Sequence, residues 1–169
     1  LIAPLVMGMP AALAWQKICE FSGLPHRMQE VSNFNNARWF NDSKGTNVGS
    51  VVKSLAGMQA PVTLIAGGKD KGGDYAPLRD ILRQKVALLI LLGEASERMS
   101  SVLGDCCPTR KVADMVEAVS VAAQATMGGG SILLSPACSS FDMYSSYEAR
   151  GDDFVAQVKK LEAKDEITA

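Results

Sequence analysis

A short segment at residues 41–47 (NDSKGTN) combines residue types that bind anions. Lys44 supplies a positive charge, and the Thr46 hydroxyl supplies a hydrogen-bond donor. Asn47 directly precedes a helix-like segment and is a candidate N-cap, and the amino terminus of a helix attracts negative charge. Taken alone, the segment is more readily explained as a capped surface turn with a solvated lysine.

A second segment, residues 67–74 (GGKDKGGD), is a glycine-rich turn that presents Lys69 and Lys71. It departs from the phosphate-loop pattern G-x-x-x-x-G-K-[ST], because Gly73 stands where the lysine is required, and it does not fit G-x-G-x-x-G. A turn of this composition could hold a carboxylate or a phosphate. A flexible surface loop explains it equally well.

A third segment, residues 135–142 (SPACSSFD), follows an apolar run and offers several hydroxyl and backbone N–H donors. These donors predict a pocket for a carboxylate. Cys138 lacks the neighbours that would activate a nucleophile, so we expect a buried and inert thiol. Arg27 follows a boundary at residues 23–25, where it is either structural or faces a cleft between this domain and whatever precedes it.

The composition narrows the possible functions. The chain has 169 residues, of which 47% are hydrophobic and 21% charged, as in soluble globular domains. Its 17 basic and 18 acidic residues give a net charge of −1, which argues against a nucleic-acid partner. His26 is the only histidine, so metal sites with two histidines are excluded. The four cysteines do not resemble a disulfide framework, and we expect reduced thiols in the cytoplasm.

The first 15 residues are uncharged, but they do not resemble a signal peptide or a membrane anchor. No basic segment precedes the apolar run, Pro4 and Pro10 interrupt it, and it is shorter than the roughly 20 residues that span a bilayer. We therefore expect no membrane partner. We expect instead that the chain starts inside a larger protein, with residues 1–8 ending one buried helix and Pro10 in the first turn of the next.

The remaining chain alternates apolar strand-like runs with amphipathic helices, which predicts an α/β domain. The sheet is expected to be Rossmann-like, doubly wound and mainly parallel, with helices on both faces and an antiparallel edge from a hairpin at residues 28–40. In such sheets ligands bind beyond the carboxyl ends of the strands, where the three segments lie. Strands are expected at 28–31, 37–40, 62–66, 86–92, 111–112 and 131–134, and helices at 10–21, 48–56, 77–83, 96–103, 115–125 and 153–163.

Taken together, the order and residues of these segments resemble the Mur ligase family of peptidoglycan synthesis, in its D-glutamate-adding group. The resemblance also includes residues 23–27 (GLPHR), residues 133–134 and the Arg150-Gly151 pair with Phe154, so it covers nearly the whole chain. The D-S-K-x-T-N and S-P-A-C-x-S elements distinguish this group from relatives that add other amino acids. Gly45, where the family often has alanine, is a departure.

The resemblance implies a fold, a domain division and a reaction. Residues 1–23 would be the terminal helices of an ATP-binding central domain, and residues 24–169 the Mur ligase C-terminal domain. ATP would phosphorylate the carboxylate of UDP-N-acetylmuramoyl-L-alanine, and the amine of D-glutamate would attack the acyl phosphate. Mg²⁺ would be bound mainly by the central domain. That domain and the amino-terminal domain of the same protein are the implied partners, and the isolated chain is expected to be inactive.

The resemblance also implies roles for individual residues. Arg27 and Asp42 would contact ATP. Lys44 and His26 are the catalytic candidates: Lys44 would lie close to the amino acid and His26 near the nucleotide and metal, where a structural role fits equally well. D-Glutamate would be held by Thr46, Lys71 and Ser140, with Phe141 and Tyr147 contributing. No metal ligand is expected in this chain.

Two other interpretations of the sequence remain open at this stage. The chain could be a free-standing module that binds a small anion without catalysis. It could also belong to a relative that adds a different amino acid.

Overall fold

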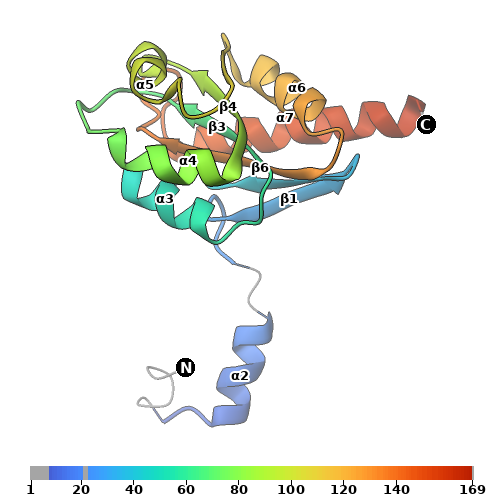
Figure 1. Ribbon diagram of the computed structural model, residues 1–169. Coiled ribbons are helices and arrows are strands. Elements are labelled where there is room, and N and C mark those ends of the chain that lie inside the picture. Colours follow the sequence, from blue (N-terminus) through green and yellow to red (C-terminus); the bar gives the residue numbers. More distant parts are fainter. Residues whose placement is uncertain (1–7, 21–22, 169) are drawn as a thin grey trace.

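The computed structural model describes residues 8–20 and 23–168 and contains a six-stranded sheet (Figure 1). The strands lie in the order β1-β2-β6-β3-β4-β5, and only the pair β1 and β2 is antiparallel. This arrangement confirms the expected α/β fold with an antiparallel edge. The strands are β1 (Gln29–Phe34), β2 (Ala37–Asn41), β3 (Val62–Gly67), β4 (Val86–Leu92), β5 (Thr109–Lys111) and β6 (Gly130–Ala137).

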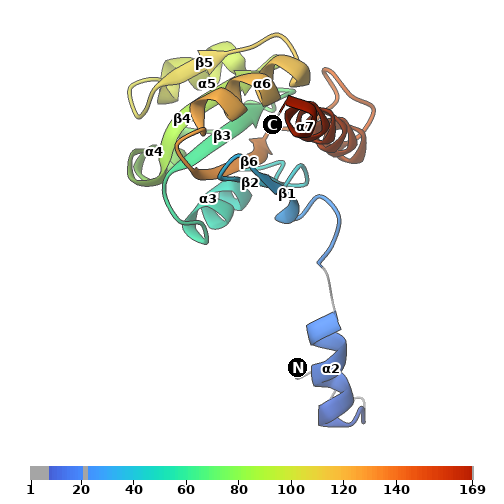
Figure 2. The ribbon, with the colours of Figure 1, turned by 90° about the vertical axis from the view of Figure 1, so that its right-hand side faces the viewer.

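Helices cover both faces of the sheet, as Figure 2 shows in the view along its edge. Helices α3 (Val48–Ala56), α4 (Arg79–Lys85) and α5 (Ser96–Leu103) contribute to one apolar core, together with the short 3-10 helix η1 (Ala76–Leu78). Helices α6 (Met115–Ala125) and α7 (Tyr147–Thr168) contribute to the other. The chain therefore builds two cores with the sheet between them.

Alternation along the central strands explains the two cores. In β3, Leu64 belongs to the core under α3 and α4, whereas the next residue, Ile65, belongs to the core under α6 and α7. In β4, Leu89 and Ile90 divide in the same way. Successive side chains of a strand point to opposite faces, so a strand buried on both faces is apolar at nearly every position. The buried Thr63 of β3 is an exception. The nearly continuous apolar run is why both strands could be recognised from their sequence.

The hairpin at the sheet edge turns more tightly than its sequence suggests. The turn consists of Asn35 and Asn36, which have positive φ angles of 51° and 61° and match the two-residue turns of β-hairpins. Strand β1 consequently extends to Phe34, beyond the expected end at residue 31, and Phe34 stacks on Trp39 with 5.5 Å between ring centres.

The largest correction concerns α7, which was expected over residues 153–163 but begins at Tyr147 and ends at Thr168. The Ser146 hydroxyl accepts a hydrogen bond from Ala149 N (3.2 Å), which is the contact of an N-cap. Smaller shifts occur elsewhere: β5 starts two residues before the expected residues 111–112 and ends at Lys111, β6 is longer at both ends, and the helix expected over residues 77–83 divides into η1 and α4.

Helix α2 (Ala11–Glu20) matches most of the expected helix at 10–21, and Figures 1 and 2 show it standing apart from the sheet. Its apolar residues Leu13, Trp15 and Ile18 are exposed. The helix end expected over residues 1–8 lies outside the described residues except for Gly8. The expected last residue of the next helix, Phe21, lies outside them as well. None of the described helices combines the length and apolar character needed to cross a membrane.

The strand order brings the three polar segments together at the carboxyl-terminal ends of the strands. From β3 the chain continues to β4 and then to β5, on one side of β3. It then crosses back to β6, which lies on the other side of β3. Ligands bind at such a topological switch point, beyond the carboxyl ends of the strands. The loops after β2, β3 and β6 all leave the sheet at this end, because these three strands are mutually parallel.

Candidate active site

The loop after β2 is anchored by Asn41, whose side chain is fully buried. Its amide nitrogen donates to His26 Nδ1 (3.1 Å) and to the carbonyl oxygen of Gly151 (3.2 Å), and its Oδ1 accepts from Ser43 N (3.1 Å). One asparagine therefore connects the segment before β1, the loop after β2 and helix α7.

Asp42 is almost completely buried, and its carboxylate is an acceptor for three donors of this chain. Oδ2 accepts from the hydroxyls of Ser54 and Ser135 (both 2.8 Å), and Oδ1 accepts from Met28 N (3.3 Å). The same residue lines a pocket of about 260 Å³ together with Arg27, Lys44 and Lys53, among others. Three basic side chains at one pocket make it suitable for a polyanion such as a nucleotide phosphate chain.

Lys44 lies beside Tyr147, the first residue of α7. Its Nζ donates to the Tyr147 hydroxyl (2.9 Å) and lies 4.6 Å from the centre of the ring. The structure thus brings together two of the residues expected at the site, from segments more than a hundred positions apart. Lys44 also lines the pocket that Arg27 and Asp42 line.

His26 is buried, with both ring nitrogens facing residues of this chain. Because Nδ1 accepts from Asn41, the proton of the neutral ring lies on Nε2, and Nε2 is 3.7 Å from an oxygen of the exposed Asp152 carboxylate. The backbone carbonyl of His26 also accepts from Lys44 N (3.1 Å). The ring and the backbone of His26 therefore support the loop that carries Lys44.

Thr46 and Lys71 line a second pocket, of about 320 Å³, with Tyr75 and Ala137 among the other lining residues. The Lys71 ammonium donates to the carbonyl oxygen of Thr46 (3.2 Å), and so links the loops after β3 and β2. The pocket lies at the amino terminus of α3. Asn47 is confirmed as the N-cap of that helix, since its Oδ1 accepts from Ser50 N (2.9 Å).

The third loop leaves β6 through Ala137, which has a positive φ of 60° and donates its N–H to Gly45 O (2.9 Å). Ser140 is buried, whereas Phe141 is 72% exposed. Within the described part of the chain, no hydrogen bond joins Ser140 or Phe141 to Thr46 or Lys71. Cys138 is buried, and burial raises the pKa of its thiol, which agrees with the expected inert cysteine.

Close approach of the loops requires glycine at two positions. A Cβ atom at Gly67 would lie 2.1 Å from Leu92 O, and one at Gly68 would lie 2.3 Å from Ser139 O. Both residues also have positive φ angles, of 113° and 129°. The glycine-rich segment after β3 is thus in part a packing requirement of the neighbouring strand and loop.

Sequence reasoning assigned no role to Arg150, although the structure places it at the centre of the loops. Arg150 is 2% exposed, and its guanidinium donates to four oxygens, which are Ser43 Oγ (3.0 Å) and the carbonyls of Ser43 (2.9 Å), Ser139 (3.1 Å) and Cys138 (3.2 Å). Burial lowers the pKa of Arg150 to about 10, so the group remains charged at neutral pH. A signal existed, because Arg150 precedes the buried Phe154 and Val158 at helical spacing.

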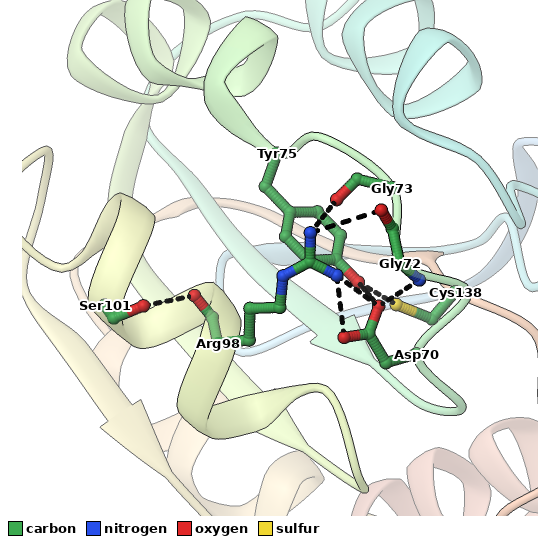
Figure 3. A network of polar contacts seen from close by, with 7 residues as sticks. All are labelled: Asp70, Gly72, Gly73, Tyr75, Arg98, Ser101 and Cys138. Carbon is green, nitrogen blue, oxygen red and sulfur yellow. Dashed lines mark hydrogen bonds and ion pairs between the residues drawn. The ribbon is translucent and has the colours of Figure 1, made fainter.

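Sequence reasoning also assigned no role to the ion pair between Arg98 and Asp70. Asp70 lies between Lys69 and Lys71 in the chain. Arg98 Nη1 lies 3.0 and 2.9 Å from the two oxygens of Asp70. Figure 3 shows this contact together with Tyr75 and Cys138. Among the described residues, no three His, Cys, Asp or Glu side chains are grouped closely enough to bind a metal ion.

The chain is similar in sequence to known proteins along most of its length. The family described as Mur ligase, glutamate ligase domain, matches residues 26–138. The UDP-N-acetylmuramoylalanine–D-glutamate ligase of Syntrophotalea carbinolica is 54% identical over 162 residues, which are 96% of this chain and 36% of that protein. The same ligase from Geotalea uraniireducens is 49% identical over 162 residues, with the same coverage. The chain thus spans about 36% of the length of these relatives.

A solved structure resembles the whole chain in fold. The MurF ligase from Thermotoga maritima, in complex with ADP, matches 97% of this chain and 37% of its own with a TM-score of 0.64 and 14% sequence identity. At this identity the likeness concerns the fold alone. The family match and the high identity to the two ligases go further, and they show that the chain belongs to the Mur ligase family and contains its glutamate ligase domain.

Proposed function

We propose that this chain is the D-glutamate-binding and ATP-capping domain of a ligase that adds D-glutamate to UDP-N-acetylmuramoyl-L-alanine. In this reaction the γ-phosphate of ATP is transferred to the carboxylate of the muramoyl-alanine substrate. The amine of D-glutamate then attacks the acyl phosphate, an amide forms, and ADP and phosphate are released. The supporting relatives carry this ligase name, and the chain is 54% identical to one of them.

The observation that carries the proposal is the pocket between Thr46 and Lys71. The Lys71 ammonium reaches the Thr46 carbonyl at 3.2 Å, and the amino terminus of α3 lies at the same pocket. A carboxylate is stabilised by an ammonium group, a hydroxyl and the free N–H groups at the start of a helix. D-Glutamate has two carboxylates, and we assign the second to Ser140 and the backbone near Phe141 and Tyr147.

The ATP side of the site is the pocket lined by Arg27, Asp42, Lys44 and Lys53. Arg27 is exposed and free to contact phosphate, whereas Asp42 is nearly filled by donors of its own chain. We assign Lys44 to the charge that develops on the transferred phosphate, since it is held between this pocket and Tyr147. We assign His26 to positioning the Lys44 loop.

Mg²⁺ is not expected to bind to this chain by itself. The described residues hold no cluster of three carboxylate, imidazole or thiol groups, and Mg²⁺ commonly binds through one or two protein carboxylates together with substrate phosphates, so we assign it mainly to the central domain. We assign residues 1–23 to the end of the preceding central domain and residues 24–169 to the C-terminal domain. The free cysteines fit a reducing compartment, and we place the reaction in the cytoplasm.

The test uses the full-length protein that carries this chain and measures ADP release with ATP, UDP-N-acetylmuramoyl-L-alanine and D-glutamate. Lys71→Ala should raise the KM for D-glutamate at least about tenfold, because a charged hydrogen bond to a carboxylate is worth roughly 1.5–3 kcal/mol. The KM for ATP should stay nearly unchanged. Arg27→Ala should show the opposite pattern.

Lys69→Ala is the matched control, since Lys69 lies on the same loop but pairs with Glu94 (2.5 Å) away from the pocket. Equal effects of the Lys69 and Lys71 substitutions would contradict the assignment. Release of ADP with L-glutamate or a diamino acid, but not with D-glutamate, would identify a relative with another substrate. Binding of D-glutamate without ADP release would favour the anion-binding module.

A further inference from the structure

The loop that carries Lys71 is held from outside the pocket by Arg98, which lies on α5. Its Nη1 contacts both oxygens of Asp70, at 3.0 and 2.9 Å, and its Nη2 donates to the carbonyls of Gly73 (2.7 Å) and Gly72 (3.2 Å). Figure 3 shows the guanidinium reaching from the helix to these three groups of the loop. Lys71 lies between Asp70 and Gly72 in the chain, so both of its neighbours are bonded to one side chain.

Asp70 extends this contact toward the rest of the site. Its Oδ1 accepts from Gly72 N (2.9 Å) and from the Tyr75 hydroxyl (3.0 Å), and the guanidinium of Arg98 lies 5.4 Å from the centre of the Tyr75 ring. The hydrogen bond from Arg98 is the largest cause that holds the pKa of Asp70 below its usual value. The carboxylate is therefore ionised at neutral pH, and the contact persists there.

The Tyr75 hydroxyl also reaches the loop after β6. It lies 3.2 Å from Cys138 Sγ, and Tyr75 is 3% exposed. Cys138 is followed by Ser139 and Ser140, so the network that begins at Arg98 connects the segment carrying Lys71 with the segment carrying Ser140.

Lys71 itself contributes little to its own placement. It is exposed, and its one hydrogen bond in the described structure is the contact with the Thr46 carbonyl. Gly72 has a positive φ of 71° and open space around the position of a Cβ, and Gly73 is equally open. Glycine-rich segments have many accessible backbone conformations, so an external contact is needed to select one of them.

We propose that Arg98 is a positioning residue for D-glutamate binding, because it fixes the backbone on both sides of Lys71 and so aims the Lys71 ammonium into the pocket at Thr46. The proposal rests on the function assigned above. Arg98 contacts no substrate in this scheme, and it acts through Asp70, Gly72 and Gly73.

The experiment measures steady-state kinetics of the full-length protein with Arg98→Gln. Glutamine cannot bond the carboxylate and two carbonyls together, so the KM for D-glutamate should rise about fivefold, with kcat and the KM for ATP nearly unchanged. Glu97→Gln is the matched control on the same helix, since Glu97 pairs at the surface with Lys111 (2.7 Å) and lies outside the network. It should leave all three parameters at their wild-type values.

A double substitution separates positioning from general stability. In a Lys71→Ala background, Arg98→Gln should change the KM for D-glutamate less than about 1.5-fold, because the group that Arg98 positions is already absent. A fivefold rise in both backgrounds would overturn the proposal, as would an unchanged KM in the single variant. Asp70→Asn provides a second variant, which should reproduce the rise if Arg98→Gln lowers the melting temperature.

The kinetics of Lys71→Ala and Arg98→Gln together distinguish a failure of the positioning role from a failure of the proposed function. Failure of the proposed function appears as wild-type protein without D-glutamate-dependent ADP release, or as Lys71→Ala with a normal KM. Failure of the positioning role alone appears as Lys71→Ala with a raised KM and Arg98→Gln with a normal one.

Discussion

At the scale of single residues, Arg150 joins the loops after β2 and β6, although sequence reasoning assigned it no role. Its charge has no carboxylate in hydrogen-bond contact in the described structure, and it is stabilised instead by carbonyl and hydroxyl oxygens of two loops. A buried charge of this kind is tolerated only where its donors are satisfied. Burial lowers the pKa of Arg150, and the hydrogen bonds of its guanidinium fix the distance between the loops after β2 and β6.

Replacing Arg150 by methionine tests this role. Arg150→Met keeps much of the side-chain volume but leaves three buried or part-buried carbonyl groups without this donor, so the free energy of unfolding should fall by about 3 kcal/mol. The measurement is urea denaturation of the 169-residue chain, with the exposed Arg110→Met as the control. A loss no larger than that of the control would show that the loops hold together without the guanidinium.

At the scale of elements, the early start of α7 depends on Gly151. Glycine within a helix usually lowers stability and suggests a helix boundary. Here a Cβ at residue 151 would lie 2.2 Å from His26 Nδ1 and 3.1 Å from Asn41 Nδ2. The absent side chain lets the helix approach the buried histidine, so the glycine is a packing requirement within a continuous helix.

Because of this packing, we expect a glycine-to-alanine substitution at residue 151 to lower stability, whereas it usually raises stability within a helix. Gly151→Ala should destabilise the chain by about 1–3 kcal/mol through overpacking, whereas a glycine-to-alanine change in a helix normally stabilises by up to about 1 kcal/mol. Gly49→Ala in α3 is the comparison, because a Cβ there would meet its nearest neighbour at 3.5 Å. Thermal unfolding of both variants is the measurement, and a stabilised Gly151→Ala protein would contradict the packing of His26 against α7.

At the scale of the whole molecule, the sheet brings the candidate site together but supplies only part of the proposed active site. The loop after β3 lacks the lysine of a phosphate loop, and the described residues contain no metal cluster. The chain also spans about 36% of the length of its ligase relatives. In the proposed enzyme, further groups that hold the ATP phosphates and the metal would come from the rest of the protein and complete the pocket of Arg27 and Lys44.

The 169-residue chain alone should therefore show no D-glutamate-dependent ADP release. Positioning and charge stabilisation supply most of the catalysis of phosphoryl transfer, and half of a site supplies neither completely. A coupled ADP assay with all three substrates is the measurement, with the full-length protein as the positive control. Turnover by the isolated chain would contradict the proposed division of the active site.

The candidate site was predictable where its signals were local. The three polar segments and the N-cap Asn47 could be identified because each lies directly after an apolar strand or before a helix. The roles of Thr46 and Lys71 were implied only by the family resemblance, and their contact depends on the tertiary structure. Arg98 and Asp70 could not be paired in advance, since α5 and the loop after β3 are separated by another helix and strand. Arg150 bonds Ser43 across 107 positions, a distance at which sequence patterns carry no geometric information.

The sequence by itself determined the α/β class, most of the helices and strands, and the edge of the sheet where the polar loops lie. These features follow from hydrophobic periodicity, capping and the parallel direction of the strands, which are properties of short segments. Only the tertiary structure decided the strand order, the start of α7 and the network of Arg98, Asp70 and Tyr75. These depend on which distant segments pack together, because burial and hydrogen bonding between them outweigh local preferences such as that of Gly151.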